Sequence, residues 1–203
     1  MEETTNAWAD MPERNLWIRT LTVGIVGTCC YLVGAADRTD CVVIDPGDEA
    51  ERIRKAAEGR EIAAILLTHG HFDHIGGVSG LMREKTRLVI HPLDEPMLQD
   101  PDRNAGMMLL RRRITAPKAT DLVQEGTELE LAGMRIQVLH TPGHTPGSVC
   151  YRIGEHLFTG DTMFEHGWGR TDLPGGSEHD MAASLRRLIP LAQKVVIHPG
   201  HAA

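Results

Sequence analysis

The sequence has no Cys-x-x-Cys pair and no long apolar run. Its four cysteines, Cys29, Cys30, Cys41 and Cys150, lack the spacing of a zinc ribbon or a thioredoxin-type redox motif. Cys41 and Cys150 lie in apolar runs, so we expect them to act as small core residues. No run approaches the ~20 apolar residues that a membrane-spanning helix needs, so we expect no membrane partner.

Basic residues are also in deficit. The formal net charge of -7 argues against nucleic acid as a partner, because a phosphate backbone needs a basic surface. The tight basic run Arg111-Arg112-Arg113 favours a solvated helix face or loop over a phosphate or carboxylate contact. Residues 1–15 lack the basic start and apolar stretch of a signal peptide. We expect residues 1–15 to form an extension or a disordered tail, and the protein to be cytoplasmic.

The remaining 16–203 region is predicted to be a single α/β domain with its own core, since 41% of the 203 residues are apolar. Apolar runs and turn residues predict a first half with strands and helices. Its strands are expected over 16–23, 30–33, 41–44, 62–67 and 88–90, and its helices over 48–58 and 78–85. The second half is expected to be mostly antiparallel, with strands over 127–131, 134–139, 148–153 and 156–159, a helix from 177 or 180 to 188, and a strand over 194–197.

The most informative stretch is His69-Gly70-His71-Phe72-Asp73-His74, which follows the apolar run 62–67. That run is typical of a buried strand, so the His/Asp cluster would lie in the loop at its C-terminal end, where α/β sheets gather functional groups. Glycines at 70, 76 and 77 let the backbone bend and neighbouring side chains converge. Imidazole and carboxylate are ligands for zinc, iron or manganese, so we predict a metal site rather than a His-rich surface turn.

Three more predicted strand ends carry His or Asp beside Gly or Pro. They are His140-Thr141-Pro142-Gly143-His144-Thr145-Pro146-Gly147-Ser148, Phe158-Thr159-Gly160-Asp161-Thr162 and His198-Pro199-Gly200-His201. Four separate loops that each offer nitrogen or oxygen ligands are far more specific than one cluster. His140 and His144 compete for one ligand position, and His198 and His201 for another.

The succession His-x-His-x-Asp-His, Pro-Gly-His-Thr-Pro-Gly-Ser, Thr-Gly-Asp-Thr and Pro-Gly-His resembles the metallo-β-lactamase superfamily. It is most similar to the glyoxalase II-like branch, the hydroxyacylglutathione hydrolases and their shorter bacterial relatives. The run Gly169-Arg170-Thr171-Asp172-Leu173-Pro174-Gly175-Gly176 strengthens this narrower placement. The resemblance extends from about Leu16 to His201 and implies an αββα sandwich, with two sheets face to face and helices outside.

The resemblance also implies two adjacent divalent metal ions, zinc first, with iron or manganese as alternatives. The implied ligands are His69, His71 and His144 for the first metal, Asp73, His74 and His201 for the second, and Asp161 as a bridge between them.

The motif places the ligand at the histidine after Pro-Gly, which selects His144 over His140 and His201 over His198. We expect the two other histidines to lie outside the ligand set. Asp45 matches the family's acidic position after the third strand. It is expected either to orient a ligand histidine or its loop, or to cap the Pro-Gly turn.

The implied activity is hydrolysis of a small-molecule thioester, like an S-acylglutathione, or of an ester. A hydroxide shared by the two metals would attack the carbonyl carbon, and Asp73 would hold it in line. A thiolate leaves readily, so no strong general acid is needed. Glyoxalase II binds glutathione through a C-terminal helical extension, which we do not expect in this sequence because it ends two residues after His201.

Two other functions compete with this prediction. The persulfide dioxygenase branch resembles the sequence in its Gly-Arg-Thr-Asp run and would hold a single iron through His69, His144 and Asp161. The Pro-Gly-His ending at His201 favours two metals over that arrangement. A metal-binding scaffold without turnover is the third possibility, but a structural zinc site is usually closed by four ligands.

Overall fold

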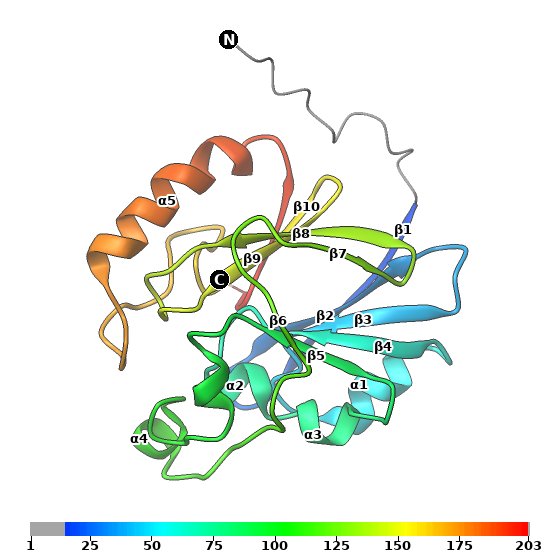
Figure 1. Ribbon diagram of the computed structural model, residues 1–203, viewed down its shortest axis with the longest axis horizontal. Helices are drawn as coiled ribbons and strands as arrows, with labels where there is room; N and C mark the ends of the chain where they lie inside the picture. Colours follow the sequence, from blue (N-terminus) through cyan, green and yellow to red (C-terminus); the bar gives the residue numbers. More distant parts are fainter. Residues whose placement is uncertain (1–14, 203) are drawn as a thin grey trace.

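The computed structural model describes residues 15–202, so only Asn15 of the predicted N-terminal extension lies within the described residues. Two β-sheets lie face to face, with α5 outside one sheet and α1, α2 and α3 outside the other (Figure 1). The predicted αββα sandwich is confirmed. None of the helices described is long and apolar enough to cross a bilayer.

The first sheet has the strand order β1-β2-β3-β4-β5-β6. Its strands are β1 (Leu16–Val23), β2 (Thr28–Ala35), β3 (Asp40–Ile44), β4 (Glu61–Leu66), β5 (Arg87–Ile90) and β6 (Asp121–Leu122). β1, β2 and β3 pair antiparallel, whereas β3 to β6 run parallel. The C-terminal ends of β3, β4 and β5 therefore lie along one edge, which is where functional loops gather in parallel sheets.

The second sheet has the order β11-β10-β9-β8-β7. Its strands are β7 (Glu128–Leu131), β8 (Met134–His140), β9 (Val149–Ile153), β10 (His156–Gly160) and β11 (Val196–Pro199). All neighbours pair antiparallel except β10 and β11. The mostly antiparallel second half is thus confirmed.

Six helical segments complete the described chain. They are α1 (Ala50–Ala56), α2 (Phe72–Ile75), α3 (Val78–Leu81), the 3-10 helix η1 (Glu95–Leu98), α4 (Gly106–Leu110) and α5 (Glu178–Ala192). α5 begins at the N-cap Ser177, whose hydroxyl accepts from the Asp180 amide. The expected end at residue 188 was wrong. The helix continues through Pro190, because Leu191 and Ala192 still pack against the outer face of the second sheet.

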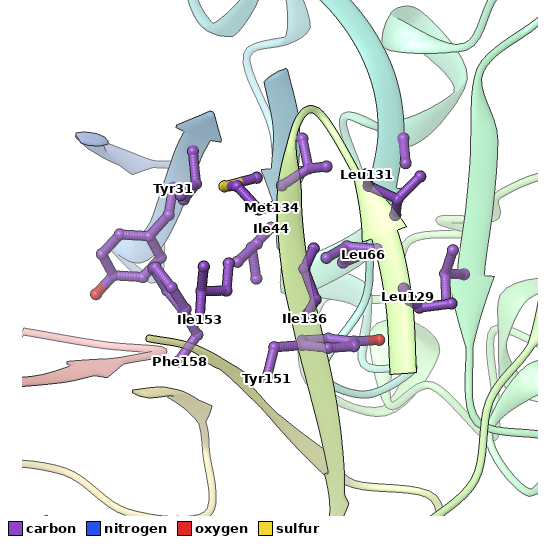
Figure 2. Close-up of a cluster of buried hydrophobic side chains, with 14 of the residues drawn as sticks. Tyr31, Ile44, Leu66, Leu129, Leu131, Met134, Ile136, Tyr151, Ile153 and Phe158 are labelled. Carbon is purple, nitrogen blue, oxygen red and sulfur yellow. The ribbon is translucent and has the colours of Figure 1, made fainter. Parts of the chain in front are cut away.

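Apolar side chains fill the three interfaces between the four layers. Figure 2 shows the layer between the sheets, where Ile44 and Leu66 of the first sheet meet Ile136 and Ile153 of the second. Alternate residues of the first sheet face α1 and α3. Cys41 and Cys150 are fully buried, as expected of core residues. The second sheet turns Cys150 and Leu157 toward α5.

Two buried tyrosines tie the sheets together at the edge that carries the His/Asp loops. The Tyr151 hydroxyl on β9 donates to the Leu67 carbonyl of the first sheet at 2.9 Å. The Tyr31 hydroxyl on β2 donates to the Pro199 carbonyl of the second sheet at 2.7 Å. Leu67 and Pro199 each lie two residues before a predicted ligand histidine, so these bonds set where both loops begin.

We predict that Tyr151→Phe lowers the free energy of unfolding by about 1–3 kcal/mol, because the buried Leu67 carbonyl loses its donor while the ring still packs. Urea denaturation monitored by circular dichroism measures the loss. Thr20→Val on the exposed face of β1 is the control and should leave the midpoint unchanged. An unchanged midpoint for Tyr151→Phe would show that this bond does not stabilise the fold.

Candidate metal centre

All seven predicted ligand residues lie together at the shared edge of the two sheets. His69 and His71 follow β4, Asp73 and His74 are in α2, His144 lies between β8 and β9, and Asp161 and His201 follow β10 and β11. They form three overlapping groups: His69, His71 and His144; His69, His74 and Asp161; and Asp73, His74 and His201. Within each group the ligand atoms lie within 4.8 Å of one another.

His69 and His144 are held so that one ring nitrogen of each carries no proton. Nδ1 of His144 lies 2.7 Å from the Arg170 carbonyl, which can only accept, so Nδ1 carries the proton. The Thr68 hydroxyl donates to Oδ2 of Asp45 at 2.6 Å, so His69 Nδ1, 3.0 Å from Thr68 Oγ1, must be the donor there. Nε2 of both rings is left with a lone pair, the form that binds metals.

His71 completes the first group. Its Nδ1 lies 2.8 Å from Nε2 of His144, close enough to share a proton or to coordinate one cation together. Burial, together with the neighbouring histidines, lowers the pKa of both His69 and His71 well below the usual value. The rings are therefore neutral, as ligands must be.

Asp161 lies between the two halves of the cluster. Its Oδ1 is 3.4 Å from Nε2 of His74, and its Oδ2 is 3.4 Å from Nε2 of His144 and 3.6 Å from Nε2 of His201. The carboxylate thus faces both halves, because Oδ2 lies near a histidine of each and Oδ1 lies near His74. This is the placement that a bridging ligand requires.

The second half of the cluster has more negative than positive charge. Burial alone would lower the pKa of His74, but the carboxylates of Asp73, Asp45 and Asp161 outweigh it and raise that pKa to about 10. Burial opposes ionisation of Asp73 too, yet His74 and His201 hold the pKa of this carboxyl well below its usual range. A single proton on His74 is thus surrounded by three carboxylates, and a dication would replace it with more favourable electrostatics.

Unpartnered polar atoms provide an independent test of whether a metal fits. Within residues 15–202, the buried side-chain nitrogen and oxygen atoms without a hydrogen bond are, apart from one arginine nitrogen, all in this cluster. They are Nε2 of His69, His71 and His74, Oδ1 of Asp161, and Nδ1 of His74. Nδ1 of His74 lies 3.0 Å from Oδ2 of Asp45, an ion-pair distance without hydrogen-bond geometry. Each such atom costs about 1–3 kcal/mol when left unpaired. Their concentration, and the imidazole/carboxylate set, fit divalent metal ions.

Asp45 contacts the loop that carries four of the ligand residues. Its Oδ1 accepts from the Thr68 amide at 2.8 Å, its Oδ2 from the Thr68 hydroxyl, and Oδ2 also lies 3.0 Å from Nδ1 of His74. The carboxylate thus contacts Thr68, at the start of the metal loop (residues 68–77), and His74 further along it. This geometry favours the expected orienting role over capping of the Pro-Gly turn.

Asp94 has a corresponding role that the sequence interpretation missed. This fully buried residue accepts from the Gly70 amide at 3.0 Å, the Gly147 amide at 2.7 Å and the Thr145 hydroxyl at 2.6 Å. It therefore fastens the metal loop to the loop that carries His144. The available signal was its position after β5, because the ends of neighbouring parallel strands lie side by side.

His140 and His198 lie outside the cluster. Nε2 of His140 is 2.9 Å from the Pro146 carbonyl, and its ring stacks on His91 with centroids 4.2 Å apart. The ring of His198 stacks on Phe158 in the inter-sheet layer, with centroids 4.5 Å apart. The structure thus brings the histidine after each Pro-Gly into the cluster and directs the competing one elsewhere.

Close backbone approach at Gly200 explains its place before His201. A Cβ there would lie 2.2 Å from Oδ1 of Asp161 and 3.0 Å from Cε1 of His74. Any larger residue would therefore push Asp161 out of its central position.

The fold and this site define a class: an αββα protein whose His/Asp cluster, at the edge between its sheets, fits divalent metal ions. The metallo-beta-lactamase superfamily matches residues 23–201 of the sequence. The chain belongs to the metallo-beta-lactamase superfamily, whose members bind divalent metals and include many hydrolases.

Two relatives illustrate the similarity. The probable metallo-hydrolase YqgX of Bacillus subtilis is 34% identical over 190 residues, which cover 90% of this chain and 89% of the relative. The hydroxyacylglutathione hydrolase GloC of Haemophilus influenzae is 34% identical over 180 residues, 81% of each chain. Hydroxyacylglutathione hydrolases are therefore among the relatives, as the resemblance implied.

Three solved structures are also similar. The BLEG-1 B3 metallo-beta-lactamase superposes with a TM-score of 0.86 at 33% identity, over 92% of both chains. TTHA1623 in a di-iron-bound form gives 0.80 at 37% identity, over 91% of this chain and 92% of that one. ETHE1 from Myxococcus xanthus superposes with a TM-score of 0.73 at 30% identity, over 92% of this chain and 76% of that one.

We predict that His144→Ala loses at least one metal equivalent, because its free Nε2 lies within the ligand cluster, whereas His140→Ala keeps the wild-type metal content. Elemental analysis after dialysis of protein expressed with zinc measures both. The reverse pattern would mean that the wrong histidine has been assigned as the ligand.

Asp94→Asn should weaken metal affinity about 10- to 100-fold, because an amide cannot accept all three hydrogen bonds that fix the ligand loops. Competition with a chromophoric chelator gives the affinity. Asp102→Asn, at an exposed position nearby, is the matched control. Equal affinities for the two variants would limit Asp94 to a role in folding.

Proposed function

We propose that the protein is a binuclear metal-dependent hydrolase that cleaves a thioester of the S-acylglutathione type, or an ester. The observation that carries this proposal is the position of Asp161, with one carboxylate oxygen toward His74 and the other toward His144 and His201. The proposed ligands are His69, His71 and His144 on one side, Asp73, His74 and His201 on the other, and Asp161 between them.

Bound there, two dications supply Lewis acidity and, near neutral pH, a hydroxide nucleophile. Zinc is proposed first, and the di-iron form of TTHA1623 supports iron as the alternative. Asp73 is proposed to orient the attacking group, because its depressed pKa keeps it a carboxylate that can accept a hydrogen bond. Nε2 of His201 at 3.3 Å and the Thr28 hydroxyl at 3.4 Å from its Oδ2 keep that carboxylate in place.

A thioester is favoured over an amide because of the leaving group. A thiol with a pKa of about 8.5 departs as thiolate, so no general acid is needed. Hydroxyacylglutathione hydrolase GloC at 34% identity supports the same substrate class.

Two other reactions have some support. The run Gly169-Arg170-Thr171-Asp172, which resembles the persulfide dioxygenase branch, supports an iron-dependent enzyme that would consume oxygen with glutathione persulfide. BLEG-1 at 33% identity supports β-lactam hydrolysis. The second half of the cluster, with Asp73, His74 and His201, favours two metals and therefore hydrolysis over the single-iron alternative.

The test is a substrate panel on zinc- and iron-loaded protein: S-lactoylglutathione, a neutral thioester, an aryl ester, a β-lactam, and glutathione persulfide with an oxygen electrode. We predict thioester hydrolysis that a chelator abolishes and zinc restores. Asp161→Ala should lower kcat/KM at least ~100-fold together with metal content, since it removes the bridge. His140→Ala should stay within about twofold of wild type.

Oxygen uptake with iron in place of hydrolysis would select the dioxygenase. If no thioester, ester or lactam is turned over in a metal-dependent way, the protein is a non-catalytic metal-binding scaffold and the proposal is wrong.

A further inference from the structure

The basic run Arg111-Arg112-Arg113 has no role in the metal centre. It lies on a segment that is hydrogen-bonded to the metal loop. Together with α4 it forms the sequence Met107-Met108-Leu109-Leu110-Arg111-Arg112-Arg113. Met108, Leu109 and the three arginines are all exposed. We call residues 108–113 the α4 patch.

The three arginines, like Arg186 on α5, have no hydrogen-bond or ion-pair partner among the described residues. Arginines elsewhere in the chain are typically matched with carboxylates, as Arg87 is with Asp121 and Arg170 with Asp172, both at 2.6 Å. Three adjacent like charges repel one another, so an anion bound among them would relieve this repulsion.

The backbone places the α4 patch beside the metal loop. The amide of Phe72, the residue between His71 and Asp73, donates to the Asn104 carbonyl at 3.0 Å. The Asn104 side chain accepts from the Gly106 amide at 3.0 Å and donates to the Ile114 carbonyl at 2.8 Å. The buried Asn104 therefore joins two parts of the chain. Its side chain bonds to both ends of the segment that carries the arginines, and its backbone carbonyl bonds to the loop that carries the ligands.

Side-chain packing adds a second attachment. Leu110 and Ile114 pack against Phe72 and against Leu173, which lies in the segment between β10 and α5. That segment follows Asp161 and contains the Arg170 carbonyl that orients His144. In Figure 1, α4 and the β10–α5 segment lie on the same side of the molecule as α2. The α4 patch thus borders the metal loop and the β10–α5 segment, two of the segments around the metal centre.

Solvent reaches the metal centre through its second half. The side chains of Asp73 and His201 keep 13% and 22% of their surface exposed, whereas those of His74 and His144 keep 0% and 3%. A substrate must therefore bring its carbonyl in from outside and leave its remaining atoms on the surrounding surface. Leu110 of the α4 patch packs against the cluster that contains Phe72, the residue before Asp73, so part of that surface is the α4 patch.

Resting on the proposed function, we propose that the α4 patch binds the anionic thiol carrier of the thioester substrate. Guanidinium groups bind carboxylates and phosphates through paired hydrogen bonds, and an always-charged arginine holds them at any physiological pH. Met108 and Leu109 offer apolar contact to the carrier chain. On a protein of net charge -7, this run also draws anionic substrates toward the metal loop.

Direct binding to the zinc-loaded full-length protein tests the inference without turnover. The triple variant R111Q/R112Q/R113Q is compared with K55Q/R186Q/K194Q, which removes the same charge from exposed positions on other elements. Calorimetry uses S-methylglutathione, which carries carboxylates, and the methyl thioether of coenzyme A, which carries phosphates. The carrier that the wild type binds should bind the α4 variant at least ~10-fold more weakly. Its affinity for the control variant should be within about twofold of that for the wild type.

Which of the two probes binds distinguishes carboxylate from phosphate recognition. If wild type binds neither, or if both variants lose affinity equally, the inference is overturned and the arginines are a solvated loop. Added salt should reduce the difference between the variants, because the contact is made at the surface.

Kinetics separate this inference from the proposed function. With thioesters of the bound carrier, the α4 variant should raise KM about 10-fold and leave kcat within about twofold, and a neutral thioester should be unaffected. Equal loss with the neutral thioester contradicts carrier binding. Wild type that binds the carrier without hydrolysing any thioester refutes the proposed function alone.

Discussion

Three carboxylates around the buried ring of His74 are the constraint on which the rest of the structure depends. Asp45, Asp73 and Asp161 all act on this ring, which has no exposed surface. Like charges at such spacing are tolerated only with positive charge among them. A proton on His74 supplies one unit, and a pair of dications would supply four. Divalent metal ions at this cluster would therefore relieve the repulsion among its carboxylates.

Hydrogen bonds from both sheets hold the loops that carry these charged side chains. Tyr31 and Tyr151 donate across the inter-sheet layer to Pro199 and Leu67, and so fix the starts of two ligand loops. Asp94 then joins the metal loop to the His144 loop. Each contact links segments distant in sequence, because the ligands come from both sheets and no single element could place them. Packing and polar bonds together supply the rigidity that a metal site needs.

Most strands could be predicted from the sequence, since their apolar runs and turn residues are local signals. The four-layer architecture came from the family resemblance. The convergence of His69, His71, Asp73 and His74 followed from six consecutive residues at a strand end. The choice of His144 over His140 came from family resemblance, because adjacent strand-end histidines look alike until stacking on His91 is seen. Asn104 could not be found, since its partners are backbone groups, and Asp94 was missed although its position after β5 was a signal. The end of α5 was missed because Pro190 is a local stop signal that packing overrides.

The central claim is that two metal ions share Asp161. X-ray diffraction from crystals of the zinc-loaded protein, collected at the zinc absorption edge, locates each ion directly by anomalous scattering. The account predicts two peaks about 3.5–4 Å apart with an Asp161 oxygen on each. One peak alone, held by His69, His144 and Asp161, or peaks away from Asp161, would contradict it.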